Sequence, residues 1–295
     1  MKKFFAVLLA TVMTMSLLTA CGSEAAETTT EETEAVETTE AEATETTEAT
    51  ETTETTETTE ATEADVAVSD ALADGVLTVG TNAEFPPFEY VDDNGEPDGF
   101  DIALIKAIGE KLGVTVEVEN MEFASLISSI GSKIDVAIAG MTVTEERKNS
   151  VDFSNSYYEA VQYVILPEGS DIATADDLKD KAIGVQLGTT GDFIASDIEG
   201  ASVSQYNKAV DAVNDLINGR VDCVIIDKNP ALVFEGKFEG QVVAVDGAQF
   251  DFEPEEYAIA MPKGDTALVE QINAALEEIK ADGTFDELVK TYIEE

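Results

Sequence analysis

The side chains that most often do chemistry are scarce in this sequence. Its 295 residues include no His, so His-based catalytic triads, His-ligated metal sites and the usual general base are excluded. Only two Cys occur, Cys21 and Cys223, and the second lies in an apolar run, residues 221–226, that predicts a buried strand. We therefore expect the Cys223 thiol to pack rather than react, with no disulfide in the folded part, no metal and no cofactor.

Two charged residues, Arg147 and Asp227, are candidates for binding chemistry. A guanidinium is planar and can make two parallel charged hydrogen bonds to a carboxylate. The charged neighbours of Arg147, residues 145–148 (EERK), would by themselves indicate only a solvated helix. Asp227 follows the apolar run and could simply cap a helix that begins near Lys228.

The balance of charge restricts the partners. The sequence has 16 Lys and Arg against 62 Asp and Glu, which gives a formal net charge of −46 and a pI near 4.1. Affinity for nucleic acids comes largely from basic side chains that displace counterions, so we expect no nucleic-acid partner.

The N-terminus carries two segments that lie outside the fold. Lys2 and Lys3 precede an apolar run, residues 4–18, which is short for a membrane span and predicts a signal peptide over residues 1–20. The motif at residues 18–21 (LTAC) resembles the lipobox of bacterial lipoproteins. That resemblance implies cleavage before Cys21, lipidation of its thiol and a membrane-anchored lipoprotein. The alternative is an ordinary signal peptide with a chance Cys at the cut.

Residues 21–65 form a segment rich in Glu and Thr. It contains 15 Glu between Glu24 and Glu63, and no Lys, Arg or aromatic residue. Such a composition cannot bury enough apolar surface to offset the entropy of the chain. We predict that the lipidated Cys21 is joined to the folded part by a disordered tether, and glycosylation of its Thr residues stays open.

From residue 66 onward, strand and helix patterns alternate, which favours an α/β fold. Residues 100–112, for example, place an apolar side chain at nearly every turn, as a helix buried on one face does. The predicted strands are residues 76–80, 114–118, 133–140, 182–186 and 221–226, and the predicted helices are residues 100–112 and 123–130.

An internal repetition suggests two similar lobes. Residues 126–136 (LISSIGSKIDV) and 213–223 (VNDLINGRVDC) each combine a helix, a Gly stop, a base, an aliphatic residue, an Asp and a buried strand. A C-terminal pair of helices, broken at Asp282-Gly283, is expected to pack on the first lobe. The chain must then cross between lobes twice, near residues 155–161 and 251–258. This assigns residues 66–156 and 256–295 to lobe 1, and residues 157–255 to lobe 2.

Four motifs carry a resemblance to a known family. They are residues 80–90 (GTNAEFPPFEY), 99–109 (GFDIALIKAIG), 139–148 (AGMTVTEERK) and 151–154 (VDFS). Together they resemble family 3, the polar amino-acid family, of bacterial extracellular solute-binding proteins, the receptors of ABC importers. Ala103 stands where that signature is usually acidic. The resemblance implies a two-lobed clamshell of the type II periplasmic-binding-protein-like fold, with two hinge crossings, in which each lobe is a mostly parallel sheet flanked by helices.

The resemblance also implies a binding site between the lobes. Arg147 would clamp the α-carboxylate of an amino acid, beside Thr142 and the backbone amide of Gly140. Asp227, from the other lobe, would accept hydrogen bonds from the α-ammonium. The amides of the turn formed by Gly188, Thr189 and Thr190 would complete the anion pocket. A ligand held from both sides would shift the lobes toward closure.

A second set of residues is expected to set side-chain selectivity. Asn82 and Gln186 offer neutral amides, which favours a polar, uncharged ligand side chain. Glu84 and Glu122 nearby could pair with a basic side chain, so a basic ligand stays an alternative. We expect a polar amino acid, with a neutral side chain slightly favoured over a basic one. Three rings match positions that line or border the family's pocket, namely Phe85, Phe88 and Phe123.

These inferences predict an extracytoplasmic, lipid-anchored receptor that delivers an amino acid to the permease and ATPase subunits of an ABC importer. The protein is expected to be a monomer and not an enzyme, and it lacks a phosphate-binding loop. Two alternatives on the same fold remain. A periplasmic dehydratase of the cyclohexadienyl type would need a protonated acid, for which Glu84 is the candidate. A ligand-sensing receptor would carry a membrane helix and a signalling domain, and the sequence to Glu295 contains neither.

Overall fold

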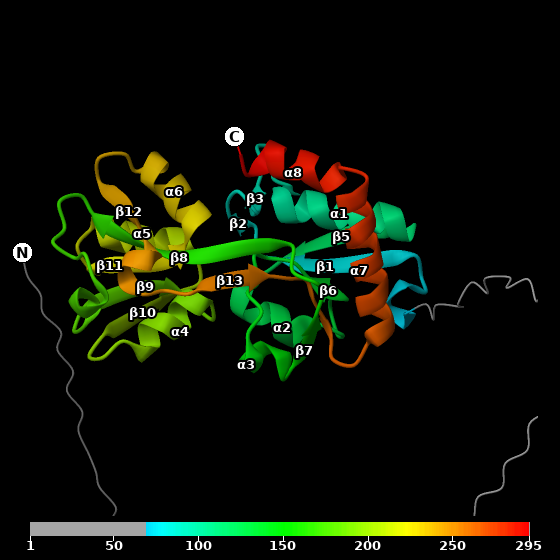
Figure 1. The fold of residues 1–295 in the computed structure, drawn as a ribbon, viewed down its shortest axis with the longest axis horizontal. Coiled ribbons are helices and arrows are strands. Elements are labelled where there is room, and N and C mark those ends of the chain that lie inside the picture. The colour runs from blue at the N-terminus through cyan, green and yellow to red at the C-terminus, as the bar shows by residue number, and fades with distance from the viewer. Residues whose placement is uncertain (1–68, 295) are drawn as a thin grey trace, which may run out of the picture. The chain divides into compact units, whose positions relative to one another are not determined.

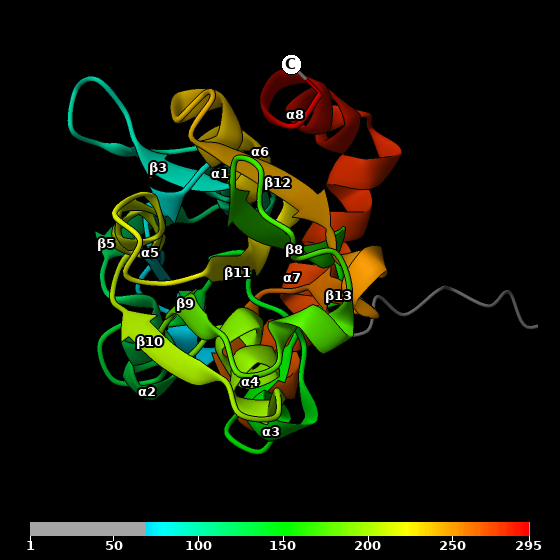
Figure 2. The same cartoon turned by 90° about the vertical axis from the view of Figure 1, so that its left-hand side faces the viewer.

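The computed structural model describes residues 69–294. The predicted signal peptide, Cys21 and the tether to residue 65 lie outside the described residues. Figure 1 shows the described part as two α/β lobes, each built on its own β-sheet, and Figure 2 turns the lobe with α4, α5 and α6 toward the viewer. Among the helices of residues 69–294, none is both long and apolar enough to cross a membrane.

Lobe 1 is built on a five-stranded sheet with the order β5-β1-β6-β14-β7, and a small three-stranded sheet, β2-β3-β4, packs on its first helix. The strands are β1 (Val76–Thr81), β2 (Glu84–Phe85), β3 (Glu89–Val91), β4 (Pro97–Asp98), β5 (Thr115–Asn120), β6 (Val136–Ala137), β7 (Val151–Phe153) and β14 (Ala260–Pro262). The helices are α1 (Phe100–Leu112), α2 (Leu126–Ser129), α3 (Glu145–Lys148), α7 (Thr266–Ala281) and α8 (Thr284–Tyr292), with short 3-10 turns at Asp70–Leu72 and Phe123–Ser125.

Lobe 2 is built on the sheet with the order β10-β9-β11-β8-β12, to which β13 is added beside β8. The strands are β8 (Tyr158–Pro167), β9 (Ala182–Gln186), β10 (Ser202–Tyr206), β11 (Cys223–Asp227), β12 (Val242–Asp246) and β13 (Pro254–Tyr257). The helices are α4 (Thr190–Asp197), α5 (Ala209–Ile217) and α6 (Lys228–Lys237), with 3-10 turns at Ala175–Leu178 and Gly247–Phe250.

Both sheets are mixed but mostly parallel, as expected, because in each five-strand order four strands run in one direction and one runs against them. β1 pairs in parallel with β5 and β6, and β9 pairs in parallel with β10 and β11. β14 and β8 instead run antiparallel to both of their sheet neighbours. The reason is connectivity, because each of these two strands receives the chain directly after it has crossed from the other lobe.

The two sheets repeat one topology. Position by position, β5-β1-β6-β14-β7 corresponds to β10-β9-β11-β8-β12, with the same parallel and antiparallel pairs. The predicted repetition of residues 126–136 and 213–223 is thereby confirmed, since each segment leads into the third strand of this order.

The two crossings run side by side. The chain leaves lobe 1 after β7 and returns to it at β14, and between these points β8 pairs with β13 from Tyr158↔Tyr257 to Val161↔Pro254. Figure 1 shows β8 and β13 extending between the two sheets. The crossings therefore lie where the sequence predicts them, and the lobe boundaries at residues 156 and 256 stay a prediction.

Local sequence explains the helices that support the site. α1 buries its apolar stripe and ends at Gly113, whose positive φ of 71° closes the helix in the left-handed conformation. The C-terminal helices α7 and α8 pack against α1, and they are separated at Asp282 and Gly283 as predicted. These helices fix the position from which the loops after β1 and β6 extend toward lobe 2.

Some predicted elements are shorter in the structure. The strand predicted over residues 133–140 is reduced to β6, because Ile134 bridges back to Ile130 and Gly140 turns the chain with a φ of +52°. Cys223 is a free, fully buried thiol, and burial raises its pKa to about 12. The expectation that it packs in the core is confirmed.

Candidate functional site

A pocket lies where strands of both lobes end. Asn82 follows β1, Gly140 follows β6, Gln186 ends β9 and Asp227 ends β11. The carboxyl ends of parallel strands meet at one edge of a sheet, and the polar residues that follow them gather there. The pocket contains about 300 Å³ of space, part of it open to solvent, and is lined by Asn82, Phe85, Glu89, Phe123, Ala139, Gly140, Thr142, Arg147, Gln186, Thr189, Thr190 and Asp227.

Ten of the twelve predicted binding residues line this pocket, and two do not. Phe88 is a core residue, 1% exposed, with its ring edge-on to Phe100, Tyr158 and Tyr257. Gly188 accepts a hydrogen bond from Arg147 through its carbonyl oxygen and does not itself line the pocket. Of the two acids expected nearby, Glu84 and Glu122, neither lines the pocket, and both border a separate surface hollow next to Asn82.

Arg147 is buried and held in a fixed orientation. It lies on α3, whose first turn is capped by the Thr144 hydroxyl. Nη1 donates to the Thr142 carbonyl at 2.6 Å, and Nη2 donates to the Gly188 carbonyl of lobe 2 at 3.0 Å. The guanidinium also lies over two rings, Phe123 at 5.4 Å and Phe193 at 5.9 Å.

The charge of Arg147 is available to a ligand. Burial lowers its pKa to about 10, so it stays protonated at neutral pH. Among the described residues, no carboxylate lies within the 4.0 Å of an ion pair with it. A guanidinium has five N–H donors, and the two bonds to carbonyls leave three for a carboxylate in the pocket.

Asp227 presents a buried carboxyl group from lobe 2. Its side chain makes no capping bond to α6, which removes the alternative of a simple helix cap. Instead Oδ1 accepts a hydrogen bond from the Tyr257 hydroxyl. Burial, reinforced by the nearby charge of Glu255, raises the pKa of Asp227 to about 7. A cation placed beside it would lower that pKa and ionise the group.

Three predicted amide donors are already committed. The N–H of Gly140 donates to Asp101 Oδ2 at 2.7 Å, the N–H of Gly188 donates to Asp192 Oδ2 at 2.9 Å, and the N–H of Thr189 donates to the Gln186 carbonyl at 3.3 Å. These three predicted roles are therefore corrected, because none of these N–H groups is free for a ligand. The remaining backbone donors are the first-turn amides of α4 at Thr190 and Gly191, which by helix geometry have no intrahelical acceptor.

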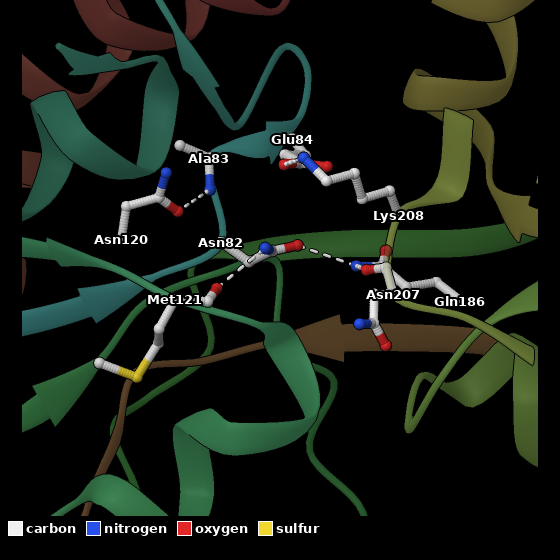
Figure 3. Close-up of polar contacts among 8 residues, drawn as sticks. All are labelled: Asn82, Ala83, Glu84, Asn120, Met121, Gln186, Asn207 and Lys208. Atoms are coloured by element: carbon white, nitrogen blue, oxygen red, sulfur yellow. Dashed lines mark hydrogen bonds and ion pairs between the residues drawn. The ribbon is translucent and has the colours of Figure 1, made fainter. Parts of the chain in front are cut away.

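The lobes touch directly beside the pocket (Figure 3). Gln186 Nε2 donates to Asn82 Oδ1 at 2.8 Å and to the Asn207 carbonyl at 3.1 Å, while Asn82 Nδ2 donates to the Met121 carbonyl. Lys208 of lobe 2 also forms an ion pair with Glu84 of lobe 1. Glu84, the acid named for a dehydratase, thus has its carboxylate bound to a lysine.

Several site residues were missed by sequence reasoning. Glu89 lines the pocket, and Glu255 on β13 accepts hydrogen bonds from the hydroxyls of Thr142 at 2.5 Å and Thr190 at 2.8 Å. Tyr257 is fully buried and bonds to Asp227. The sequence signal for Glu89 is a charged residue between Phe88 and Tyr90. Within residues 69–294 there is no group of three or more His, Cys, Asp or Glu side chains that could hold a metal ion.

Comparison with known proteins identifies relatives. The probable histidine-binding protein of Neisseria gonorrhoeae is 33% identical over 234 residues, which cover 77% of this chain and 87% of that protein. The arginine-binding extracellular protein ArtP of Bacillus subtilis is 36% identical over 222 residues, which cover 73% of this chain and 85% of that protein.

Solved structures of amino-acid-binding proteins are also similar to this chain. An ancestral arginine-binding protein bound to arginine has a TM-score of 0.70 at 44% identity and covers 74% of this chain and 98% of its own. An ancestral arginine-binding protein bound to glutamine has a TM-score of 0.68 at 44% identity, with 75% and 99% covered. The two-lobed fold is thus confirmed.

All four relatives are described as binding proteins, and the chain is a binding protein rather than an enzyme. Residues 77–295 match the family described as "Bacterial extracellular solute-binding proteins, family 3", so the chain belongs to that family.

Proposed function

We propose that this protein binds one free amino acid in the pocket between its lobes and delivers it to an ABC importer. One observation carries the proposal: a buried guanidinium from lobe 1, Arg147, and a buried carboxyl group from lobe 2, Asp227, line the same pocket. An α-amino acid has the two matching charges, a carboxylate for Arg147 and an ammonium for Asp227. Lobe 1 comprises residues 66–156 and 256–295, and lobe 2 comprises residues 157–255.

Binding is coupled to closure of the lobes. Because the two charged groups come from different lobes, a ligand makes both contacts only when the lobes are together. It therefore stabilises the closed state by the difference between its binding free energies for the closed and the open state. Thr142 of lobe 1 and Thr190 of lobe 2 both donate to Glu255 Oε2 in this structure, and opening of the lobes would separate them.

The ligand side chain is polar. Asn82 and Gln186 border the pocket with amide groups that already bond to each other and to two backbone carbonyls. The remaining capacity of these amides, such as the Gln186 Oε1 acceptor, suits a polar group and gives no full charge to pair. The named ligands of the relatives, histidine, arginine and glutamine, are all polar. The slight preference for a neutral side chain over a basic one is part of the proposal, and Glu89 is the acidic pocket residue that a basic side chain would meet.

A screen of the twenty amino acids tests the function. We expect one or a few polar amino acids to raise the melting temperature of the purified protein by several degrees, followed by a calorimetric stoichiometry of one per chain. If no amino acid shifts the melting temperature or gives heat of binding, the proposed function is wrong.

The proposal includes a lipid anchor at Cys21. The support is the motif at residues 18–21, which lies outside the described residues. We expect radiolabelled palmitate to be incorporated into the protein in bacterial cells, and Cys21→Ser to abolish incorporation and release the protein from membranes. Equal labelling of both forms would contradict the anchor.

A further inference from the structure

Two carboxyl groups, those of Glu89 and Asp101, are buried together beside the pocket. Both residues are 0% exposed, and the Asp101 N–H donates to the carbonyl of Phe88, the chain neighbour of Glu89, which brings the two residues together. Burial and the charge of Asp101 accordingly raise the pKa of Glu89. Glu89, the first residue of β3, lines the pocket, while Asp101 is the second residue of α1. Within the described part of the chain, no Lys or Arg forms an ion pair with either group.

Hydrogen-bond donors are divided unequally between the two groups. Asp101 Oδ2 accepts from the Gly140 N–H at 2.7 Å and from the Tyr157 hydroxyl at 2.8 Å. Asp101 also lies in the first turn of a 13-residue helix, where the positive end of the helix dipole favours a negative charge. Both features stabilise the ionised form of Asp101, and Glu89 has neither.

Three buried oxygens at this position lack a donor: Glu89 Oε1, Glu89 Oε2 and Asp101 Oδ1. Two adjacent carboxylates without a counter-ion would repel each other in surroundings of low dielectric constant. A buried acceptor without a donor is itself unfavourable. One proton between the two groups removes the repulsion and gives Asp101 Oδ1 a donor.

We propose that Glu89 and Asp101 share one proton, with Glu89 as the neutral carboxylic acid that donates it to Oδ1 of an ionised Asp101. Glu89 then acts as a positioning residue. It holds Asp101, which holds the Gly140 amide and so fixes the segment that follows β6 along the pocket wall. In terms of the proposed function, this is the wall against which the amino acid lies.

The surrounding groups agree with this assignment. Burial and the charge of Asp101 hold the pKa of Glu89 well above its ordinary value of 4.5, and Asp227 on β11 raises it further. Burial raises the pKa of Asp101 to about 6, against the opposing effect of its bonds to Gly140 and Tyr157. Tyr157 and Tyr257 are neutral, since the pKa of each hydroxyl lies well above 10. Arg147, on α3, directs two of its N–H groups to the carbonyls of Thr142 and Gly188.

Carbon-13 NMR of the ligand-free protein tests the protonation state directly. With carboxyl-labelled glutamate, we expect one resonance at the chemical shift of a neutral acid at pH 7, absent from the Glu89→Gln variant. Ordinary glutamates are ionised at that pH and resonate elsewhere. A Glu89 resonance at the carboxylate position would overturn the proposal. Because no amino acid is added, this result is independent of whether the protein binds one.

The pH dependence of stability gives a second test. Since the folded state holds the Glu89 proton more tightly than the unfolded chain does, this contribution to stability is fully present below pH 4.5 and is lost as the pH rises through the raised pKa. Each unit of pKa difference corresponds to about tenfold in the folding equilibrium constant. Glu89→Gln keeps an N–H donor toward Asp101 but cannot titrate.

The comparison uses urea unfolding from about pH 5 to about pH 8. We expect the decline in the folding equilibrium constant to be at least about tenfold smaller in Glu89→Gln than in the wild type. Glu96→Gln, which removes an exposed acid from the loop between β3 and β4, should decline as the wild type does. A Glu89→Gln profile parallel to the wild type would reject the shared proton.

Discussion

At the scale of single residues, the site depends on Arg147, which stays charged and oriented although no carboxylate of the described residues forms an ion pair with it. Two backbone carbonyls and two aromatic rings surround its guanidinium, and these groups attract a cation without neutralising it. The side chain is therefore oriented before any ligand arrives, which lowers the entropy lost on binding.

Replacement of Arg147 should mainly affect ligand binding. We expect Arg147→Ala to weaken affinity for the amino acid found in the screen by about 2 to 5 kcal/mol, because the ligand carboxylate would be buried without its partner. Arg147→Lys keeps the charge but loses the two parallel hydrogen bonds, so its affinity should lie between those of the wild type and Arg147→Ala. Isothermal titration calorimetry measures both.

The matched control is Arg220→Ala. Arg220 is exposed and pairs with Asp215 on the surface of lobe 2. Affinity should stay close to that of the wild type. Equal affinity of Arg147→Ala and Arg220→Ala would mean that Arg147 does not hold the carboxylate.

Sequence reasoning identified most of the pocket residues but not their hydrogen bonds. Arg147, Asp227, Asn82 and Gln186 lie in or beside motifs that are recognisable along the chain. Tyr257 could not be found in this way, because its bond to Asp227 joins the second crossing to β11. The occupied amide of Gly140 was missed for the same reason, since its acceptor is 39 residues earlier.

At the scale of elements, the start of α1 links the small sheet to the pocket. The first two amides of α1 donate to the carbonyls of Pro87 and Phe88, which directly precede Glu89. Gly99, before the helix, has a φ of +124°, and an added Cβ there would lie 2.3 Å from the Phe88 oxygen. The backbone can approach this closely only because residue 99 has no side chain.

The two glycines that flank α1 should respond differently to substitution. Gly99→Ala combines backbone strain with a clash against main-chain atoms, and we expect a loss of about 3 kcal/mol or more in the free energy of unfolding. Gly113→Ala, at the other end, meets no atom within 4 Å and should lose about 1 kcal/mol through its positive φ alone. Urea titrations measure both, and similar losses would contradict the role of close approach at Gly99.

Elements with their own local signals were predicted well. α1 has the predicted bounds, because its apolar repeat and the closing Gly113 are both local. β9 was predicted with its bounds as well. β6 was predicted too long, since its length depends on pairing with β1 and β14, which the sequence of residues 133–140 does not contain.

At the scale of the whole folded part, direct bonds between the lobes act beside the pocket. The Asn82–Gln186 hydrogen bond is buried, whereas the Glu84–Lys208 ion pair is largely exposed. An exposed ion pair contributes about 0.2 to 1 kcal/mol and is screened by salt. It should therefore adjust the balance between open and closed lobes rather than determine it.

Lys208→Ala should shift this balance slightly toward the open state. We expect affinity for the amino acid to fall about two- to fivefold at low salt, with the difference shrinking as salt is added. Lys263→Ala is the matched control, because Lys263 pairs with Asp152 inside lobe 1. Calorimetry at two salt concentrations compares the affinities of the two variants. Equal effects of Lys208→Ala and Lys263→Ala would exclude a role for the Glu84–Lys208 ion pair in closure.

The pairing of β8 with β13 limits how the lobes can move. Four consecutive residue pairs, from Tyr158↔Tyr257 to Val161↔Pro254, bind the outgoing and returning chains into one ribbon. A two-stranded ribbon bends and twists as a unit, whereas two separate linkers would let the lobes translate and tumble independently. Opening should therefore involve few degrees of freedom. An importer that recognises the relative orientation of the lobes would then meet mainly two arrangements, open and closed.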